Sequence, residues 1–205
     1  MVNLMTGSAK SSNFFCAGET TLPFLMTTRN LILRPLLHLD SNNLSDSIKE
    51  GIKDMKMWLP WISTTPKAED YKMITATFYR EAENNEAKHV VVFHNENFIG
   101  MVSLYNIDNL DTAATLGYWF VNNKSKEILM EALRAAAQLA FEDWRLERLV
   151  IPCVAGNYFN EMAAKELSFK LNKVDLSGGQ FIKIYELRAA NFNQKVDLNI
   201  IHSHK

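Results

Sequence analysis

One stretch of the sequence places residues that could bind a phosphate group. Residues 117–141 read GYWFVNNKSKEILMEALRAAAQLAF, in which an aromatic strand pattern passes through a polar turn into a helical pattern. The first N–H groups of a helix have no partner within the helix and carry partial positive charge, so a strand–turn–helix of this kind suits an anion. The turn contains no glycine, however, and the same residues also fit a scaffold without a ligand.

The sequence around this turn predicts the elements that must position it. Three strands are expected before it, at residues 89–95, 98–107 and 113–121, and HNEN closes a hairpin between the first two. A helix with one apolar face is expected from Lys126 to Phe141. The next segment, ERLVIPCV at residues 147–154, is nearly all apolar, which predicts a strand buried on both faces.

The remaining patterns complete an alternation of strands and helices. RNLILRPL predicts a first strand that stops at Pro35, and the following helix has Asp40 or Ser41 as its cap. A second helix is expected next, and residues 67–70 form its charged first turn. Residues 157–171 predict a short helix and residues 181–189 a last strand. The expected order is strand, two helices, three strands, helix, strand, helix, strand.

Composition limits the class of protein. The chain has 205 residues, of which 47% are apolar and 22% charged, as in a globular protein of one domain. Its net charge of −1 provides no overall basic field for nucleic acid or an anionic membrane. Cys16 and Cys153 are too few for a disulfide framework or a zinc site, and no secretory signal or membrane-length apolar run is present. We therefore expect a cytoplasmic protein without a metal.

Six segments, in this order and spacing, resemble the GNAT-superfamily acetyltransferases: LILRPL, MWLPWI, FIGMVSLYNID, LGYWF, EAL and ERLVIPCVAGN. The resemblance is to the branch that acetylates the N-terminal serine or alanine of ribosomal proteins, and it spans Thr27 to Leu187. It implies an α+β fold of three layers, with helices on both faces of a mixed, mostly antiparallel sheet that is splayed between its fourth and fifth strands. We expect a lead-in at residues 1–26, partly ordered, the GNAT domain at 27–188 and a C-terminal extension at 189–205. The apolar residues of that extension predict an added strand or a dimer contact.

The resemblance implies that acetyl-CoA lies across the splay. The residues that would contact it are Gly117, Tyr118, Trp119, Phe120, Val121, Lys124, Ser125, Lys126, Glu127, Ile128 and Asn157. Lys124 stands at the first position of the family's Gln/Arg-x-x-Gly-x-Gly/Ala loop, while Ser125 and Glu127 stand close to its glycines. The Glu127 carboxylate would repel a phosphate, so we expect weakened binding. Tyr118 and Trp119 could equally be core residues, and both interpretations hold if their side chains face opposite sides of the sheet.

The family's usual catalytic groups are only partly present. A carboxylate commonly precedes the GYW segment, where this chain has Thr115, and the Asn-x-x-Ser pattern after the fifth strand has Asn160 in place of its serine. The candidates for catalysis are therefore Cys153, Tyr158, Asn160 and Asp108. A strand cysteine such as Cys153 is also common as inert packing.

Trp58 and Trp61 of MWLPWI, together with Tyr105, would line the acceptor groove, although the tryptophans fit a core role equally well. The expected function is acetyl transfer from acetyl-CoA to a primary amine, either a protein or peptide N-terminus or a small amine. The alternative is a catalytically impaired GNAT-fold protein that binds ligands or partners. A monomer or a homodimer fits either function.

Overall fold

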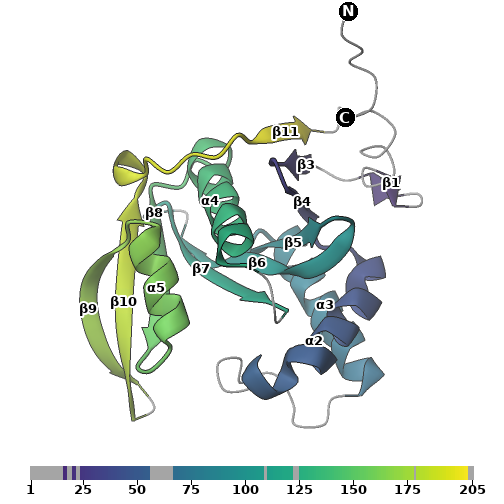
Figure 1. Ribbon diagram of the computed structural model, residues 1–205, viewed down its shortest axis with the longest axis horizontal. Coiled ribbons are helices and arrows are strands. Elements are labelled where there is room, and N and C mark those ends of the chain that lie inside the picture. Colours follow the sequence, from purple (N-terminus) through teal and green to yellow (C-terminus); the bar gives the residue numbers. More distant parts are fainter. Residues whose placement is uncertain are drawn as a thin grey trace, which may run out of the picture.

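A mixed sheet organises the part of the chain that the structure describes. The computed structural model describes residues 16–17, 20–21, 24–55, 67–108, 110–121, 125–177 and 179–202. Nine of its strands form one sheet in the order β11-β3-β4-β5-β6-β7-β8-β10-β9 (Figure 1). Their bounds are β3 Phe24–Thr27, β4 Leu31–Pro35, β5 Lys88–His94, β6 Asn97–Asp108, β7 Ala113–Phe120, β8 Arg148–Val154, β9 Lys170–Ser177, β10 Gln180–Arg188 and β11 Asn199–His202. A separate pair joins β1 (Cys16–Ala17) to β2 (Thr20–Thr21).

Helices cover both faces of this sheet. Their bounds are η1 His38–Asp40, α2 Ser41–Met55, α3 Ala68–Glu83, α4 Lys126–Glu142, α5 Tyr158–Glu166 and η2 Ala189–Asn191. On one face, Phe78 of α3 stacks on His89 of β5. On the other, Phe159 of α5 contacts Tyr118 of β7, and Lys126 of α4 pairs with Glu166 of α5. The three-layer α+β architecture predicted from the sequence is therefore confirmed (Figure 1).

Several local predictions are confirmed by the residues that begin and end the elements. The first predicted strand ends at Pro35, and α2 begins at Ser41 directly after η1. The HNEN turn joins β5 to β6 as an antiparallel hairpin, with Asn95 and Glu96 at φ values of 50° and 64°. Two successive residues with positive φ are typical of a type I′ hairpin turn.

The prediction that the ERLVIPCV strand is buried on both faces was wrong. In β8 the side chains of Leu149, Ile151 and Cys153 are buried, whereas those between them are only half-buried. Among the described elements, α2 contacts β6 and α3 contacts β5, so this helix pair lies over the centre of the sheet and leaves β8 partly uncovered on that face.

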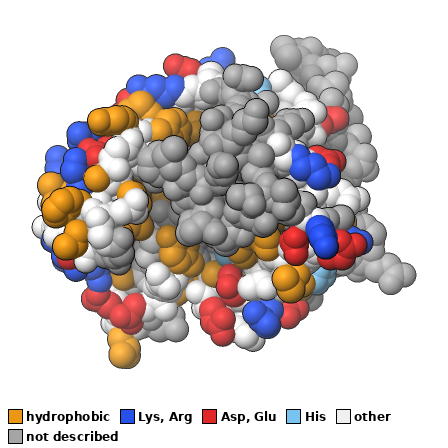
Figure 2. Space-filling view, turned by 90° about the horizontal axis from the view of Figure 1, so that it is seen from below, with side chains coloured by type: hydrophobic (Ala, Val, Ile, Leu, Met, Phe, Trp, Pro, Cys, Tyr) orange, Lys and Arg blue, Asp and Glu red, His pale blue; other side chains and the backbone are white. Residues whose placement is uncertain are grey.

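The sequence also missed strand β9. The sequence predicts a helix that continues to residue 171, but α5 ends at Glu166 and Ser168 has a φ of 67°, which stops the helix. As an edge strand with its apolar side chains exposed, β9 lacks the alternation that marks a half-buried strand. Leu171, Val174 and Leu176 of β9 and Phe181 of β10 are exposed at this end of the sheet. Figure 2 shows hydrophobic side chains on the surface at its left, the side on which these strands lie.

Strands β3 and β11, from near the two ends of the described chain, form the edge of the sheet opposite to β9. In the C-terminal extension, β11 pairs with β3, so the added strand is the alternative that the structure shows. Phe24, Leu25 and Met26 of β3 are buried, which means that the sheet begins before residue 27.

Gly100 of β6 allows a close contact between β6 and β7. Its φ is 154°, and a Cβ atom built on it would lie 2.3 Å from the Trp119 carbonyl oxygen and 2.7 Å from Cδ1 of Phe120. The β5–β6 ladder shifts register between Val92 and Phe93, where Val92 pairs with Gly100 and Phe93 with Phe98. This is a β-bulge, and glycine is the residue that suits its backbone.

We predict that Gly100→Ala lowers the free energy of unfolding by about 3 kcal/mol or more, because backbone atoms of β7 cannot yield to a new Cβ. Gly179→Ala is the matched control, since Gly179 also has a positive φ, 77°, but no atom within 4 Å of its Cβ position. The control is expected to lose only about 1 to 2 kcal/mol. Urea denaturation of both variants measures the difference, and equal losses would show that the contact with β7 does not matter.

Candidate active site

Strands β7 and β8 separate shortly after they meet. Their parallel pairing comprises Ala113 with Arg148, Ala114 with Leu149 and Thr115 with Val150. Beyond Thr115, β7 continues to Phe120 beside β6, and β8 continues to Val154 beside β10. Among the described residues, the facing edges therefore have no further strand partner, and an extended ligand could use their backbone N–H and C=O groups. The splay predicted between these two strands is confirmed.

Alternate side chains of β7 serve the two faces of the sheet. Gly117 pairs with Ser103 of β6, which pairs with His89 on the α3 side. Tyr118, the next residue along β7, contacts Phe159 of α5 with ring centroids 6.3 Å apart. Trp119 returns to the α3 side, where its ring lies 5.8 Å from Phe98. Tyr118 thus faces the α4 and α5 side of the opening, whereas Trp119 is buried core on the opposite side.

The Tyr118 hydroxyl is a buried donor without a partner. Its Oη has no hydrogen-bond partner among the described residues. Burial raises the pKa of Tyr118, and the charge that Cys153 would carry as a thiolate raises it further. The hydroxyl is therefore protonated at neutral pH and lies near Cys153. Because buried polar groups nearly always have a partner, an orphaned hydroxyl beside an opening in the sheet indicates a ligand that would accept its hydrogen bond.

Cys153 is buried and held as a neutral thiol. Burial raises its pKa to about 12, with a further contribution from the carboxylate of Glu161. That carboxylate accepts hydrogen bonds from Lys183 Nζ at 2.8 and 2.9 Å and from Tyr185 Oη at 3.4 Å. Since the thiolate is the nucleophilic form, Cys153 is unsuited to attack a thioester at neutral pH.

The first turn of α5 holds three of the predicted residues. Asn157 is buried and caps the helix, because its Oδ1 accepts a hydrogen bond of 3.1 Å from the Asn160 N–H. Tyr158 is 80% exposed, and Asn160 is half-buried. Neither Tyr158 nor Asn160 is enclosed as Tyr118 is.

The first turn of α4 already holds an anion. Ser125 is the N-cap, and its Oγ accepts a hydrogen bond of 3.3 Å from the Ile128 N–H. The Glu127 carboxylate accepts hydrogen bonds from its own backbone N–H and from the Ser125 hydroxyl, which lower its pKa together with the charge of Lys126. A carboxylate therefore lies close to N–H and hydroxyl donors that a phosphate could use. Lys124, at the first position of the predicted loop, lies outside the described residues.

The other predicted residues are spread over both faces and the rim. The ring of Tyr105 fills the space over Gly117, where a Cβ would lie 2.8 Å from Cε1 of the tyrosine. Asp108 is exposed and accepts hydrogen bonds from the N–H groups of Leu110 and Asp111, which fixes the turn after β6. Phe120 and Ile128 are half-buried, and the N–H of Val121 donates to the Ile99 carbonyl. Trp58 and Trp61 lie outside the described residues.

A hydrogen-bonded chain near the opening was not anticipated from the sequence. His89 lies between Ser103 and Glu81, with one ring nitrogen toward each. A hairpin closed at Asn95 and Glu96 without irregularity would pair His89 with Val102, and the bulge at Val92 and Phe93 brings Ser103 opposite His89 instead. The HNEN turn in the sequence therefore predicts the partner of His89 only to within one residue, Val102 in place of Ser103.

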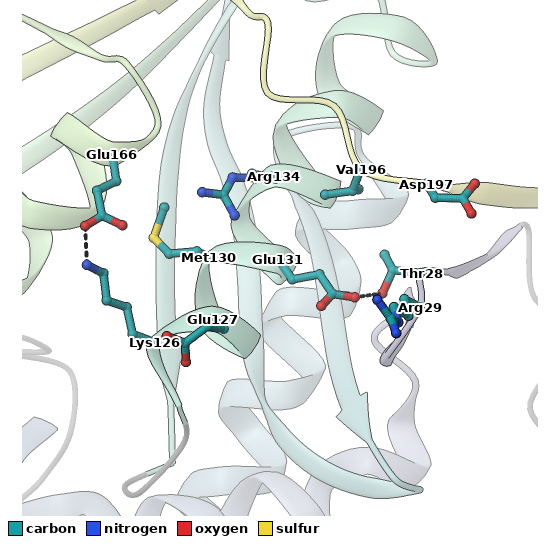
Figure 3. Close-up of a pocket in the computed structure, with 10 residues that line it drawn as sticks. All are labelled: Thr28, Arg29, Lys126, Glu127, Met130, Glu131, Arg134, Glu166, Val196 and Asp197. Carbon is teal, nitrogen blue, oxygen red and sulfur yellow. Dashed lines mark hydrogen bonds and ion pairs between the residues drawn. The ribbon is translucent and has the colours of Figure 1, made fainter.

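A surface hollow of about 540 Å³ lies along α4, and its two ends are fixed by Glu166 with Lys126 and by Glu131 with Thr28 (Figure 3). Four carboxylates and three cationic side chains line it together with Thr28, Met130 and Val196: Glu127, Glu131, Glu166, Asp197, Arg29, Lys126 and Arg134. An excess of carboxylates disfavours a polyanion. We therefore place the candidate site at the β7–β8 opening and the adjoining first turn of α4, which borders this hollow at Lys126 and Glu127, and not in the hollow itself.

Within the described residues, no group of three His, Cys, Asp or Glu side chains could hold a metal ion. None of the described helices is long and apolar enough to cross a membrane.

Comparison with known proteins places residues 30–170 in the family described as the acetyltransferase (GNAT) domain. YdaF of Bacillus subtilis (strain 168), named for ribosomal N-acetyltransferase activity, is 24% identical over 142 residues, or 68% of this chain and 78% of its own. The ribosomal-protein-serine acetyltransferase of Escherichia coli (strain K12) is 25% identical over 140 residues, or 66% and 78%. The solved structure of Mycobacterium smegmatis RimJ in complex with CoA-disulfide has a TM-score of 0.76 at 15% identity and covers 84% of this chain and 90% of its own.

We predict opposite stability changes for two tyrosines near Cys153. Tyr118→Phe removes a buried hydroxyl that lacks a partner and should raise the free energy of unfolding by about 1 kcal/mol. Tyr185→Phe removes one of the two side chains that donate to Glu161 and should lower it by about 1 kcal/mol. Thermal or urea denaturation of the ligand-free variants gives both signs. Destabilisation by Tyr118→Phe would mean that its hydroxyl has a partner in the free protein.

Proposed function

The chain belongs to the GNAT acetyltransferase family, and we propose that this acetyl-CoA-dependent acyltransferase acts on the N-terminal amine of a protein or peptide. The observation that carries the proposal is the opening between β7 and β8, with unpaired strand edges and the orphaned Tyr118 hydroxyl beside it. The names of both bacterial relatives favour a ribosomal protein as acceptor. They also favour turnover over a GNAT fold kept only for binding. A ribosomal acceptor would place the reaction in the cytoplasm.

The residues of the opening fit acetyl-CoA in three respects. The free edge of β7 after Thr115 can pair with the amides of the pantetheine arm as an added strand would. The N–H groups of the first turn of α4 can hold the diphosphate once the Glu127 carboxylate swings away. Tyr118 can donate a hydrogen bond to the thioester of acetyl-CoA. Because the Tyr118 hydroxyl lies near Cys153, this contact requires the thioester to lie there as well.

The chemistry that these residues support is direct transfer. The lone pair of the acceptor amine attacks the thioester carbonyl carbon, the carbon–sulfur bond breaks, and the coenzyme leaves as a thiolate that takes up a proton. Cys153 remains a thiol, which argues against an acetyl-cysteine intermediate. Tyr118 is protonated and enclosed, so we assign it the donor role toward the leaving sulfur. Tyr158 and Asn160, at the start of α5, remain candidates for contacts with the acceptor.

The acceptor would approach on the α3 side of the sheet. There, Val150 and Pro152 of β8 and Tyr105 of β6 are half-buried and form an apolar floor beside the opening. Such a surface suits an extended peptide terminus, whose amine can reach the reacting carbon through the gap.

The direct test is an acetyl-transfer assay with peptides that begin with serine or alanine. We expect stoichiometric release of coenzyme A thiol and a mass gain of one acetyl group at the α-amine. The same peptides with a blocked N-terminus but a free lysine should remain unmodified. Saturable binding of acetyl-CoA without transfer to any amine would favour the impaired-enzyme alternative, and absence of binding would overturn the proposal.

Removing the internal anion should strengthen coenzyme binding. Glu127→Gln frees the donors of the α4 first turn and removes a negative charge near the diphosphate, so we expect coenzyme A to bind about tenfold more tightly in calorimetric titration. Glu69→Gln is the matched control, because Glu69 also stands in the first turn of a long helix, α3. The control should leave binding unchanged. Equal or weaker binding by Glu127→Gln would show that the diphosphate is held elsewhere.

A further inference from the structure

Glu81, His89 and Ser103 form a continuous hydrogen-bonded chain from α3 through β5 to β6. His89 Nε2 lies 3.0 Å from Glu81 Oε2, and His89 Nδ1 lies 2.9 Å from Ser103 Oγ. The His89 side chain is only 3% exposed, whereas that of Glu81 is 32% exposed. The buried imidazole therefore connects a half-buried serine at one end of the chain to a partly exposed carboxylate at the other.

Glu81 determines which nitrogen of His89 carries the hydrogen. A carboxylate can only accept, so the contact with Glu81 favours the tautomer with a hydrogen on Nε2. The lone pair of Nδ1 then faces Ser103, whose hydroxyl donates to it. Hydrolases use the same arrangement: the histidine takes the proton of the serine, and the carboxylate holds the imidazole in the required tautomer without becoming protonated itself.

The serine end of the chain lies beside the β7–β8 opening. Ser103 pairs with Gly117, two residues beyond Thr115, the last residue of β7 that pairs with β8. Directly opposed residues of antiparallel strands have Cβ positions about 5 Å apart. Ser103, Tyr105 and Thr115 share the α3 face, and Thr115 stands where the family resemblance leads one to expect a catalytic carboxylate.

We propose that this chain supplies the base of the acetyl transfer: Ser103 and one water relay a proton from the acceptor amine to His89, and Glu81 is the positioning residue. The inference rests on the proposed function. The acceptor arrives as an ammonium ion and loses two protons in all. One passes through Ser103, whose own hydrogen moves to Nδ1 of His89. Glu81 stabilises the charged imidazole that results, and His89 returns this proton through Ser103 and water to solvent once the product has left. The other ends on the coenzyme thiol as the carbon–sulfur bond breaks.

The surroundings of His89 favour its neutral form, which is the form that can accept a proton. Burial lowers the pKa of His89, and the hydrogen bond and charge of Glu81 partly oppose this effect. The groups that face the ring among the described residues are Phe78 and Glu81 of α3 and Ser103 of β6. Because its pKa is lowered from the ordinary value for histidine, the imidazole is neutral at pH 7 and becomes protonated only at a lower pH than an exposed histidine does.

Substitutions at three positions test the chain through kcat measured at saturating acetyl-CoA and peptide. His89→Gln should lower kcat about 100-fold and remove the acidic limb of its pH profile. Ser103→Ala should lower kcat about tenfold or more, and Ser103→Thr, which keeps the hydroxyl, should restore most of it. Glu81→Gln keeps an acceptor for Nε2 but removes the charge that raises the pKa of His89, so the acidic limb should move to lower pH. A purely structural role would not move this limb. His94→Gln, at the far end of β5, is the matched control and should leave kcat unchanged.

A readout without catalysis separates this inference from the proposed function. A long-range proton–nitrogen correlation spectrum of the free protein should show His89 with its hydrogen on Nε2, and Ser103→Ala should perturb the Nδ1 signal. The opposite tautomer would overturn the chain even in an active enzyme. So would folded Ser103→Ala and His89→Gln variants with kcat within about threefold of the wild type. If the wild type acetylates nothing while the tautomer is as stated, the failure lies with the proposed function.

Discussion

The separation of β7 from β8 is the constraint on which the rest of the site depends. The two strands are held together only at their start, where the N–H groups of Glu147 and Arg148 both donate to the Thr112 carbonyl and three residue pairs follow. Each strand then stays with its other neighbour, β7 with β6 and β8 with β10. Because the strands are parallel and α4 connects them, the opening lies at their carboxyl ends, next to the first turn of α4. Open sheets commonly bind ligands at the corresponding place.

In the proposed mechanism, the two-residue period of β7 places the leaving-group donor and the base on opposite faces of the sheet. Tyr118 faces α5 and Cys153, where the thioester end is proposed to lie, while Gly117 and its neighbour Ser103 face the half-exposed surface proposed for the acceptor. Gly117 has no side chain, and the Tyr105 ring occupies the space instead. A donor for the leaving group and a base for the amine can thus act from opposite sides without competing for the same protons.

Patterns within one element were sufficient to predict much of this arrangement, whereas contacts between elements were not. The apolar stripe of α4, the breaker at Pro35 and the HNEN turn each depend on residues close in sequence, and they predicted α4, β4 and the β5–β6 hairpin. The register of that hairpin depends on the bulge opposite Gly100, which no local pattern marked. The exposure of one face of β8 depends on where α2 and α3 lie, and the orphaned hydroxyl of Tyr118 depends on how β8 and α5 enclose it.

The unusual first turn of α4 affects binding more than it affects chemistry. Ser125 and the Glu127 N–H donate to the Glu127 carboxylate in the free protein, so a diphosphate exchanges one anion for another at these donors and gains only the difference. None of these atoms belongs to the Glu81–His89–Ser103 chain, which lies on the other face of the sheet. In the proposed enzyme, the Glu127 carboxylate would therefore weaken the binding of the coenzyme while leaving the proposed proton path intact. On this view, weak affinity for acetyl-CoA is compatible with an enzyme that turns over whenever the coenzyme is bound.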